Sequence, residues 1–352
     1  MAGVGTVDSM RTAFGKTFDN DPGFLNTASI GVPPRDAVEE LTAAVERWRT
    51  GAKIPDYGDH GDIAKQAWAR IVGVPAETVA LGGSVAQLVG LVASNLPDGA
   101  RVLVVKQEFT SVAFPFAAQE HRGVKVSEVD GAALASTVDG HDLVAVSVVQ
   151  SVDGTIADLD ALRDAAKATG ARVLLDVSQA AGWLPLDLSW ADFVVGANYK
   201  WLMSPKGASW LAVAPGALDS VTPHNAGWWA GEDPWTSAYG LPLRLAGTAR
   251  RLDVSPSWFA AVGSAATLPW IASLDMAEVR EHCVGLADSV LAGLGLPPRG
   301  SAIISLDMPG GAERLTETGV TFSQRAGRIR LAFHLYNTAE DVALVLRALR
   351  SE

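Results

Sequence analysis

The chain has 352 residues, 48% of them hydrophobic and 19% charged, with 28 Lys and Arg residues against 39 Asp and Glu residues. This composition supports a large buried core and excludes a disordered or fibrous protein. The formal net charge of -11 argues against a nucleic-acid partner.

The cysteine count and the hydropathy pattern narrow the possibilities further. The single cysteine, Cys283, excludes a disulfide framework or a thiolate metal cluster within one chain and suits a reducing compartment. No segment reaches the roughly 18 uncharged apolar residues of a membrane span, and residues 1–20 lack the pattern of a secretory signal. We therefore expect a cytoplasmic protein that has no metal site and contacts neither membrane nor nucleic acid.

The first half of the chain predicts a helix followed by alternating strands and helices. The helix is expected over Asp36–Thr50, with an apolar stripe made of Val38, Leu41, Val45 and Trp48. Seven β-branched runs are predicted to be strands: Val79–Leu81, Arg101–Lys106, Val124–Val129, Leu143–Val149, Arg172–Asp176, Asp192–Val195 and Ser209–Ala214. Amphipathic stretches such as Leu159–Thr169 lie between them. The alternation indicates an α/β fold with a mostly parallel seven-stranded sheet covered by helices.

After Arg250 the pattern changes to long helices and shorter strands. The predicted helices are Trp258–Leu274, Ala277–Leu294 and Thr338–Leu349, the last with Thr338 as its N-cap, and the predicted strands are Ala302–Asp307, Val320–Ser323 and Arg328–Phe333. These elements predict a smaller α+β C-terminal domain. We place the large domain at 25–248 and the small domain at 249–352 together with the N-terminal arm 1–24, and expect the ligand site in the cleft between them.

Two residues that follow neighbouring predicted strands carry the chemistry. Asp176 ends one apolar strand, and Lys200 follows the next strand in a short turn, so both are expected at the carboxyl edge of the sheet, where α/β proteins bind ligands. Pyridoxal phosphate requires a carboxylate on its pyridinium nitrogen and a lysine that forms a Schiff base with its aldehyde. Taken singly, Asp176 reads equally as a loop carboxylate that caps a helix, and Lys200 as a surface amine.

The motifs resemble those of a known family. Asp176-Val177-Ser178-Gln179, Tyr199-Lys200 and a series from Phe24–Ser29 to Arg330–Thr338 resemble the class V aminotransferase group of fold-type I pyridoxal-phosphate enzymes, over nearly the whole chain. That group contains cysteine desulfurases, kynureninases, isopenicillin N epimerases and the C–S lyases of ergothioneine synthesis. The resemblance implies pyridoxal 5'-phosphate as cofactor, Lys200 as the catalytic lysine and a homodimer with its sites at the subunit interface.

The resemblance also assigns residues to the cofactor phosphate. Ser84 and Val85 lie where a predicted strand meets a helix, and free N–H groups at a helix start favour an anion; an ordinary Ser N-cap is the alternative. The family pattern gives the phosphate to Ser84, Val85 and Tyr199, and to Thr248 from a partner subunit. Without the family, Gly247-Thr248 reads as a turn.

The resemblance also assigns residues to the pyridine ring of the cofactor and to the substrate. Phe109 falls where the family stacks a ring on the pyridine, although it reads equally as a core residue, and Gln179 falls near the cofactor's 3' oxygen. Ser151 stands near a position usually filled by Asn, which leaves its role open. Arg330 matches the arginine that grips the substrate carboxylate, and Ser29 is expected beside the substrate. Alone, Arg330 would read as part of a solvated strand face.

Three features of the chain bear on which activity of the family it has: the position of its single cysteine, a loop with neighbouring tryptophans, and a tyrosine in an early loop. Cys283 lies in a predicted helix, not on the mobile loop that a cysteine desulfurase needs, so a carbon–sulfur β-lyase is favoured. A loop with Trp228 and Trp229 could surround a quaternary ammonium through cation–π contacts, or pack at a dimer interface. Tyr57 could donate a proton to the leaving sulfur, or simply pack in its loop.

The resemblance to the ergothioneine C–S lyases implies hercynylcysteine sulfoxide as the small-molecule amino-acid substrate. Cleavage would give a sulfenic acid, later reduced to ergothioneine, together with pyruvate and ammonia. A kynureninase-like hydrolase or another amino-acid lyase is the enzymatic alternative. A non-catalytic protein with the same fold is the other class of function, and the joint presence of Asp176, Gln179, Lys200 and Arg330 argues against it.

Overall fold

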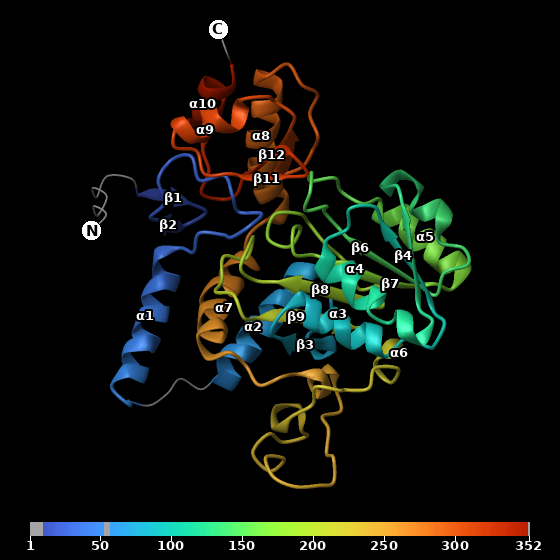
Figure 1. Cartoon of the computed structure of the whole chain (residues 1–352). Helices are drawn as coiled ribbons and strands as arrows, with labels where there is room; N and C mark the ends of the chain where they lie inside the picture. The colour runs from blue at the N-terminus through green and yellow to red at the C-terminus, as the bar shows by residue number, and fades with distance from the viewer. Residues whose placement is uncertain (1–9, 53–56, 351–352) are drawn as a thin grey trace.

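Seven strands form one sheet at the centre of the computed structural model, which describes residues 10–52 and 57–350 and the side chains of all of these except 57 and 58 (Figure 1). The strands are β3 (Val79–Gly82), β4 (Arg101–Val105), β5 (Lys125–Val129), β6 (Leu143–Ser147), β7 (Arg172–Asp176), β8 (Phe193–Ala197) and β9 (Ser209–Val213). Their order is β3-β9-β8-β7-β6-β4-β5, and β9 alone runs against the others. All seven predicted strands are confirmed, and so is the mostly parallel α/β sheet.

A second, smaller sheet lies at the C-terminal end of the chain. It contains β10 (Ile303–Leu306), β11 (Ser323–Arg325) and β12 (Arg328–Ala332) in the antiparallel order β10-β12-β11. The helices of this part are α8 (Met276–Gly293), α9 (Gly311–Glu317) and α10 (Ala339–Leu349). Thr338 is the N-cap of α10, as predicted, and forms a capping box with Asp341.

The strand predicted at Val320–Ser323 is wrong in its position, because β11 begins where that prediction ends. Residues 320–322 instead run beside the N-terminal segment: Leu25 N donates to the carbonyl of Thr321 at 2.8 Å, and Val320 is buried in the small core. The backbone N–H and C=O of Thr321, which a longer β11 would pair with β12, are thus bonded to Gly23 and Leu25 instead.

An N-terminal hairpin was not predicted from the sequence. It consists of β1 (Arg11–Ala13) and β2 (Lys16–Phe18), which pair antiparallel. The Arg11 guanidinium donates to Asp341 at 2.5 Å in α10, and both side chains are buried. This ion pair fastens the N-terminal segment to the small sheet's helices, beside which Figure 1 shows it.

The first helix is confirmed, but its apolar stripe does not face the core. α1 (Arg35–Arg49) stands at the side of the molecule (Figure 1), and Val38, Val45 and Trp48 are 44%, 37% and 54% exposed. Only the small side chains Ala37 and Ala44 of this helix are buried. Much of the stripe therefore stays exposed, although Trp48 contacts Phe259 of α7, with ring centroids 5.8 Å apart.

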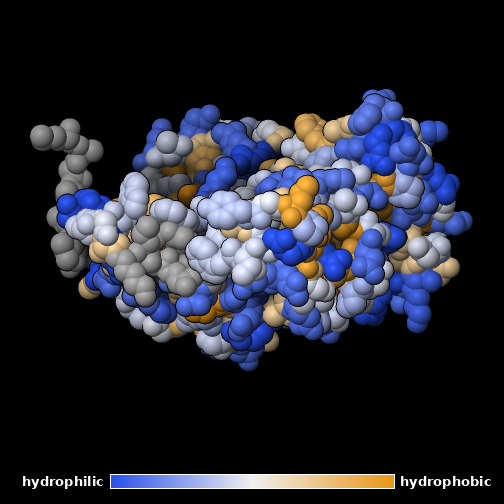
Figure 2. All heavy atoms as spheres, turned by 90° about the horizontal axis from the view of Figure 1, so that it is seen from below, coloured by the Kyte–Doolittle hydropathy of each residue, from blue (hydrophilic) through white to orange (hydrophobic). Residues whose placement is uncertain are grey.

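A second open apolar segment precedes the short helix η6 (Ala249–Leu252). This segment, residues 228–243, is called the aromatic loop below; it starts with η5 (Trp228–Ala230) and projects from the end of the molecule that is lowest in Figure 1. Figure 2 looks at that end and shows hydrophobic residues among hydrophilic ones. Tyr239 and Leu241 are 90% and 88% exposed.

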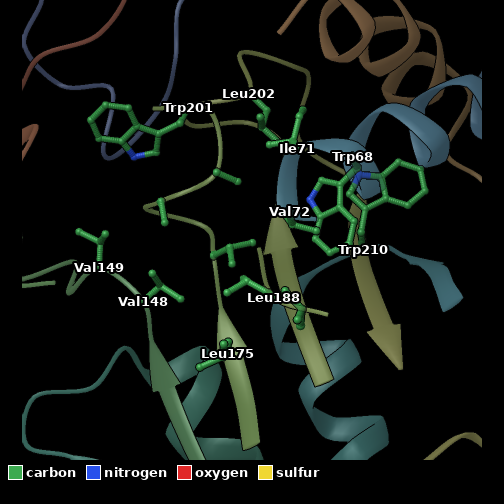
Figure 3. Packing of buried hydrophobic residues seen from close by; sticks show 14 of the residues in the cluster. Trp68, Ile71, Val72, Val148, Val149, Leu175, Leu188, Trp201, Leu202 and Trp210 are labelled. Atoms are coloured by element: carbon green, nitrogen blue, oxygen red, sulfur yellow. The ribbon is translucent and has the colours of Figure 1, made fainter. Parts of the chain in front are cut away.

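Helices cover both faces of the central sheet, and strand residues alternate between the two cores. One core packs against α2 (Tyr57–Val72), α5 (Leu159–Thr169) and α7 (Trp258–Ile271), and the other against α3 (Val85–Ser94), α4 (Thr110–Ala117) and α6 (Pro215–Leu218). In β4, Leu103 belongs to the first core and Val104 to the second, as the two-residue period of a strand requires. Figure 3 shows Trp68 of α2 beside Trp210 of β9 in the first core.

The remaining one-turn helices are η1 (Ala76–Thr78), η2 (Glu120–Arg122), η3 (Gly131–Ala133) and η4 (Ala135–Thr137). None of the helices within 10–52 and 57–350 combines the length and the apolar character needed to cross a bilayer.

Candidate active site

The carboxyl ends of β3, β7 and β8 enclose a cavity of about 260 Å³. Six residues singled out in the sequence line it: Ser84, Val85, Phe109, Asp176, Tyr199 and Lys200. They come from segments up to 116 positions apart, and the shared sheet edge brings them together, as the strand order predicts.

Lys200 is a buried amine. Its Nζ lies 5.1 Å from the ring centroid of Phe109 and 5.7 Å from that of Tyr199. Burial lowers the pKa of Lys200 to about 8; Asp176 opposes this shift, while Arg330 and Arg325 add to it. A part of the amine is therefore neutral near physiological pH, as a base or nucleophile requires.

Neighbouring side chains and one glycine hold the turn that carries Lys200. The Asn198 side chain accepts from Trp210 Nε1 at 2.8 Å and donates to Ser264 at 2.9 Å. Gly31 packs so closely that a Cβ built on it would stand 2.0 Å from the carbonyl oxygen of Lys200, and its N–H donates to Tyr199. Only glycine permits this contact, which fixes the N-terminal segment against the lysine turn.

Asp176 is the buried carboxylate that ends β7. Its Oδ1 accepts the backbone N–H of Ser178 at 2.8 Å. Burial raises the pKa of Asp176, against the hydrogen bonds from Ser178 and the charge of Lys200, which lower it. Ser178 Oγ in turn accepts the N–H of Ala197 at 3.0 Å, which ties the ends of β7 and β8 together.

The start of α3 and a second lysine form another side of the cavity. Ser84 is the N-cap of α3 and accepts the N–H of Gln87 at 3.3 Å, so it is both a helix cap and a lining residue. Lys206 also lines the cavity, and its Nζ lies 5.6 Å from the centroid of Tyr199. From the sequence, Lys206 is the runner-up to Lys200 for the Schiff-base lysine, set aside because it lies in the turn-rich stretch Ser204-Pro205-Lys206-Gly207; a place at the phosphate was not predicted for it. The signal was available, because β9 starts at the edge where the parallel strands end, and Lys206 lies just before β9.

Phe109 is 41% exposed and is therefore not a core residue. A buried carboxylate that the sequence analysis missed positions it: Glu108 accepts the N–H of Phe109 at 2.8 Å, the N–H of Ser147 at 2.9 Å and Gln150 Nε2 at 3.0 Å. Burial raises the pKa of Glu108 while these hydrogen bonds lower it. No pattern in the sequence distinguishes this glutamate from a surface one.

A hydrogen-bond chain links the cavity to the small sheet. Gln179 Nε2 donates to Ser151 Oγ at 3.1 Å and to the carbonyl of Ala28 at 2.9 Å, while its Oε1 accepts from Trp201 at 2.7 Å. Arg330 Nη1 donates to the same Ser151 Oγ at 2.9 Å. Ser151 thus accepts from both neighbours, which leaves its own hydroxyl hydrogen free to donate.

Arg330 is buried but faces only neutral oxygens in the described part of the chain. It donates to Ser151 from Nη1, to Ser323 Oγ from Nε at 3.0 Å and to Ser29 Oγ from Nη2 at 2.9 Å. Burial, with a contribution from Arg325, lowers the pKa of Arg330 to about 10. It is therefore not part of a solvated strand face, and its charge is available to an anion.

Seven predicted residues with described side chains do not line this cavity. Four of them, Ser29, Ser151, Gln179 and Arg330, form the hydrogen-bonded group described above, and the other three lie elsewhere. Trp228 and Trp229 belong to the aromatic loop, with their ring centroids 5.1 Å apart, and none of the cavity's lining residues comes from that loop. Thr248 caps η6 by accepting the N–H of Arg250 at 3.4 Å. The side chain of Tyr57, at the start of α2, lies outside the described residues.

The cavity fits pyridoxal phosphate in the chemistry of its groups. It offers a partly neutral amine for an aldehyde, a buried carboxylate for a protonated ring nitrogen, an exposed aromatic face, and helix-start N–H groups with Lys206 for a phosphate. Pyridoxal 5'-phosphate is therefore the cofactor of this site.

Comparisons with known proteins agree with this site. The chain is 26% identical over 304 residues to an uncharacterized aminotransferase, YcbU, of Bacillus subtilis, covering 80% of each. It is 29% identical to a kynureninase of Salinispora tropica, covering 75% of this chain and 69% of the relative.

A solved structure has the same fold, and a family pattern spans most of the chain. The cystine C–S lyase C-DES in complex with cysteine persulfide superposes with a TM-score of 0.82 at 20% identity, covering 94% of this chain and 97% of that one. The sequence pattern of the family described as Aminotransferase class-V matches residues 63–302. The chain therefore belongs to the class-V aminotransferase family.

Proposed function

We propose that the protein is a pyridoxal-phosphate-dependent carbon–sulfur β-lyase that cleaves hercynylcysteine sulfoxide. One observation carries the choice of a lyase over a desulfurase. The chain has a single cysteine, Cys283, which is fully buried in α8, and burial raises the pKa of its thiol. Such a thiol cannot act as a nucleophile at the site, whereas a β-lyase needs only a base and a carboxylate grip.

The residues of the cavity have distinct tasks in this reaction. Lys200 and Asp176 would hold the cofactor, with Ser84, Val85, Tyr199 and Lys206 at its phosphate. When bound, pyridoxal phosphate supplies an electron sink that stabilises the carbanion of the amino acid. Arg330 binds the α-carboxylate, and the neutral amine of Lys200 takes the α-proton.

The products follow from the bonds that break. Loss of the α-proton and of the C–S bond releases the sulfenic acid, and hydrolysis of the remaining three-carbon unit with one water gives pyruvate and ammonia. A separate reductant must then convert the sulfenic acid to the thiol. Tyr57 stays a predicted proton donor to the sulfur.

The substrate proposal depends on a second copy of the chain. Trp228 lies 5.1 Å from Trp229 and 5.4 Å from Trp235 between ring centroids, so the three rings form one cluster. The rings meet edge to face or tilted, at interplanar angles of 83° and 49°, and a ring face in contact with a quaternary ammonium contributes about 0.5–2 kcal/mol. We propose that in a cytoplasmic homodimer the aromatic loop and Thr248 of one subunit reach the cavity of the other.

The test is pyruvate release by the purified, cofactor-loaded protein. Hercynylcysteine sulfoxide, cysteine and kynurenine are compared in parallel, with Lys200→Ala as the blank and Lys167→Ala, an exposed lysine of α5, as the matched control. Pyruvate from the sulfoxide alone, present in K167A and absent in K200A, supports the lyase. Alanine from kynurenine, with no pyruvate from the sulfoxide, would overturn the substrate and favour the kynureninase-like alternative. Alanine from cysteine would overturn the choice of a lyase over a desulfurase.

A further inference from the structure

Three arginines lie on one face of the hairpin that β11 and β12 form. Arg325 pairs with Arg328 across the turn, and Arg330 pairs with Ser323; paired residues of antiparallel strands share a face. The two turn residues, 326 and 327, have positive φ values of 47° and 76°, as in the tight turns that fix hairpin register. The hairpin therefore holds a row of guanidinium groups at set spacing.

Two of these guanidinium groups converge on one hydroxyl of the site. Arg330 Nη2 donates to Ser29 Oγ at 2.9 Å, and Arg325 Nη2 approaches the same oxygen at 3.4 Å. Arg330 is 1% exposed, whereas Arg325 is exposed. Arg330 is thus buried beside Ser29, and Arg325 lies next to the same serine at the surface.

The charges of these two groups are not balanced by the described part of the chain. Arg328 lies 3.8 Å from a carboxylate oxygen of Asp307, but no carboxylate among the described residues lies within ion-pair distance of Arg325 or Arg330. Two unpaired cations that share one neutral acceptor repel each other, and anions would stabilise them. An amino acid has one α-carboxylate, which Arg330 takes, so the charge of Arg325 remains.

We propose that Arg325 binds a second anionic group of the substrate and selects amino acids with an acid at the far end. The inference builds on the proposed function in one respect, that Lys200 and Arg330 receive an α-amino acid. Hercynylcysteine sulfoxide carries a second carboxylate, whereas cysteine and kynurenine do not. Arg325 is exposed, so the second anionic group of the substrate remains near solvent.

The experiment measures binding of paired amino acids to the cofactor-loaded full chain. L-2-aminoadipate and L-norleucine have the same carbon chain and differ in the distal carboxylate, as do L-glutamate and L-norvaline on a shorter chain. None has a leaving group on its β-carbon. Their Kd values, from the absorbance of the bound cofactor and from calorimetry, are compared in the unmodified protein and in Arg325→Gln, Arg325→Lys and Arg328→Gln.

We expect the unmodified protein to bind at least one dicarboxylic ligand about tenfold more tightly than its partner, the effect of one charge-assisted hydrogen bond. R325Q abolishes this preference, R325K retains part of it, and R328Q retains all of it. No preference in the unmodified protein, or an unchanged preference in R325Q, would overturn the proposal. Equal weakening of both ligands in R325Q would overturn it as well, by placing Arg325 on the α-carboxylate. Because these ligands cannot undergo elimination, the result is independent of whether the sulfoxide is cleaved.

Discussion

The sheet edge around Lys200 and the aromatic loop differ in where their partners lie. At the sheet edge, Asp176 and Lys200 are buried, and their neighbours belong to the same chain. In the aromatic loop, Trp235, Tyr239 and Leu241 are 77%, 90% and 88% exposed. Exposed apolar patches of this kind usually mark an interaction surface. One chain therefore assembles the groups of the sheet edge, whereas the apolar side chains of the loop are left uncovered by the described part of the chain.

The first way to test the sheet edge is to remove its amine. Lys200→Ala should lower the rate of α-proton removal by about 10³-fold or more, since both the base and the covalent anchor of the cofactor are lost. Borohydride reduction followed by peptide mapping should place the reduced cofactor on Lys200 in the unmodified protein. A reduced cofactor on Lys206, the other amine of the cavity, would contradict the assignment.

The matching test for the loop is to replace its exposed apolar side chains. Trp235→Ser combined with Leu241→Ser should weaken self-association by about 1000-fold, because buried anchor side chains contribute about 2 kcal/mol each and every 1.4 kcal/mol is tenfold. Sedimentation velocity over a concentration series measures this. Leu296→Ser, at a 42% exposed leucine between α8 and β10, is the control and should leave the oligomeric state unchanged. An unmodified protein that sediments as a monomer would refute the dimer.

The pKa of Lys200 offers a further test of the sheet edge, because burial within one chain is the main cause of its shift. With a pKa of about 8, the rate of cofactor capture by the apoprotein should rise about tenfold between pH 7 and pH 9. In an unfolded chain the pKa is higher, so Lys200 makes the native state gain stability as pH rises from about 8 toward 10.5. Stopped-flow absorbance measures the rate of cofactor capture. Asp176→Asn should move the midpoint to lower pH, because the Asp176 charge raises the pKa of Lys200.

The smallest expected effect is at the hydrogen-bond chain to the small sheet. Ser151→Ala removes the acceptor shared by Gln179 and Arg330 but leaves the 2.5 Å bond from Arg330 to the carbonyl of residue 151. We expect KM for the amino acid to rise about fivefold, since one hydrogen bond contributes about 1 kcal/mol. Steady-state kinetics checks this, and Ser136→Ala on the surface is the control. An unchanged KM with a lowered kcat would instead place Ser151 at the cofactor.

The sequence predicted the central sheet well because all its strands except the edge strand β5 are buried on both faces and read as mostly apolar runs. The same apolar runs predicted Asp176 and Lys200 at the sheet edge, whereas Phe109 and Tyr199 were implied by the family resemblance. The exposure of the α1 stripe was not predicted, since periodicity reports that a helix has an apolar face and not what covers that face. Glu108 and Arg325 were missed because ordinary surface residues have the same local sequence, and only tertiary contacts distinguish them.

The contact at Gly31 has a consequence for how this site can diverge. It joins the segment bearing Ser29 to the lysine turn through backbone atoms alone, so no side-chain replacement can adjust the distance between them. The β11–β12 hairpin tip, by contrast, is a solvent-facing turn whose residues can be exchanged without touching that contact. In the proposed enzyme, reaction chemistry and substrate range therefore reside in separately mutable parts, and new specificities can arise at 324–328 while the residues around Lys200 stay unchanged.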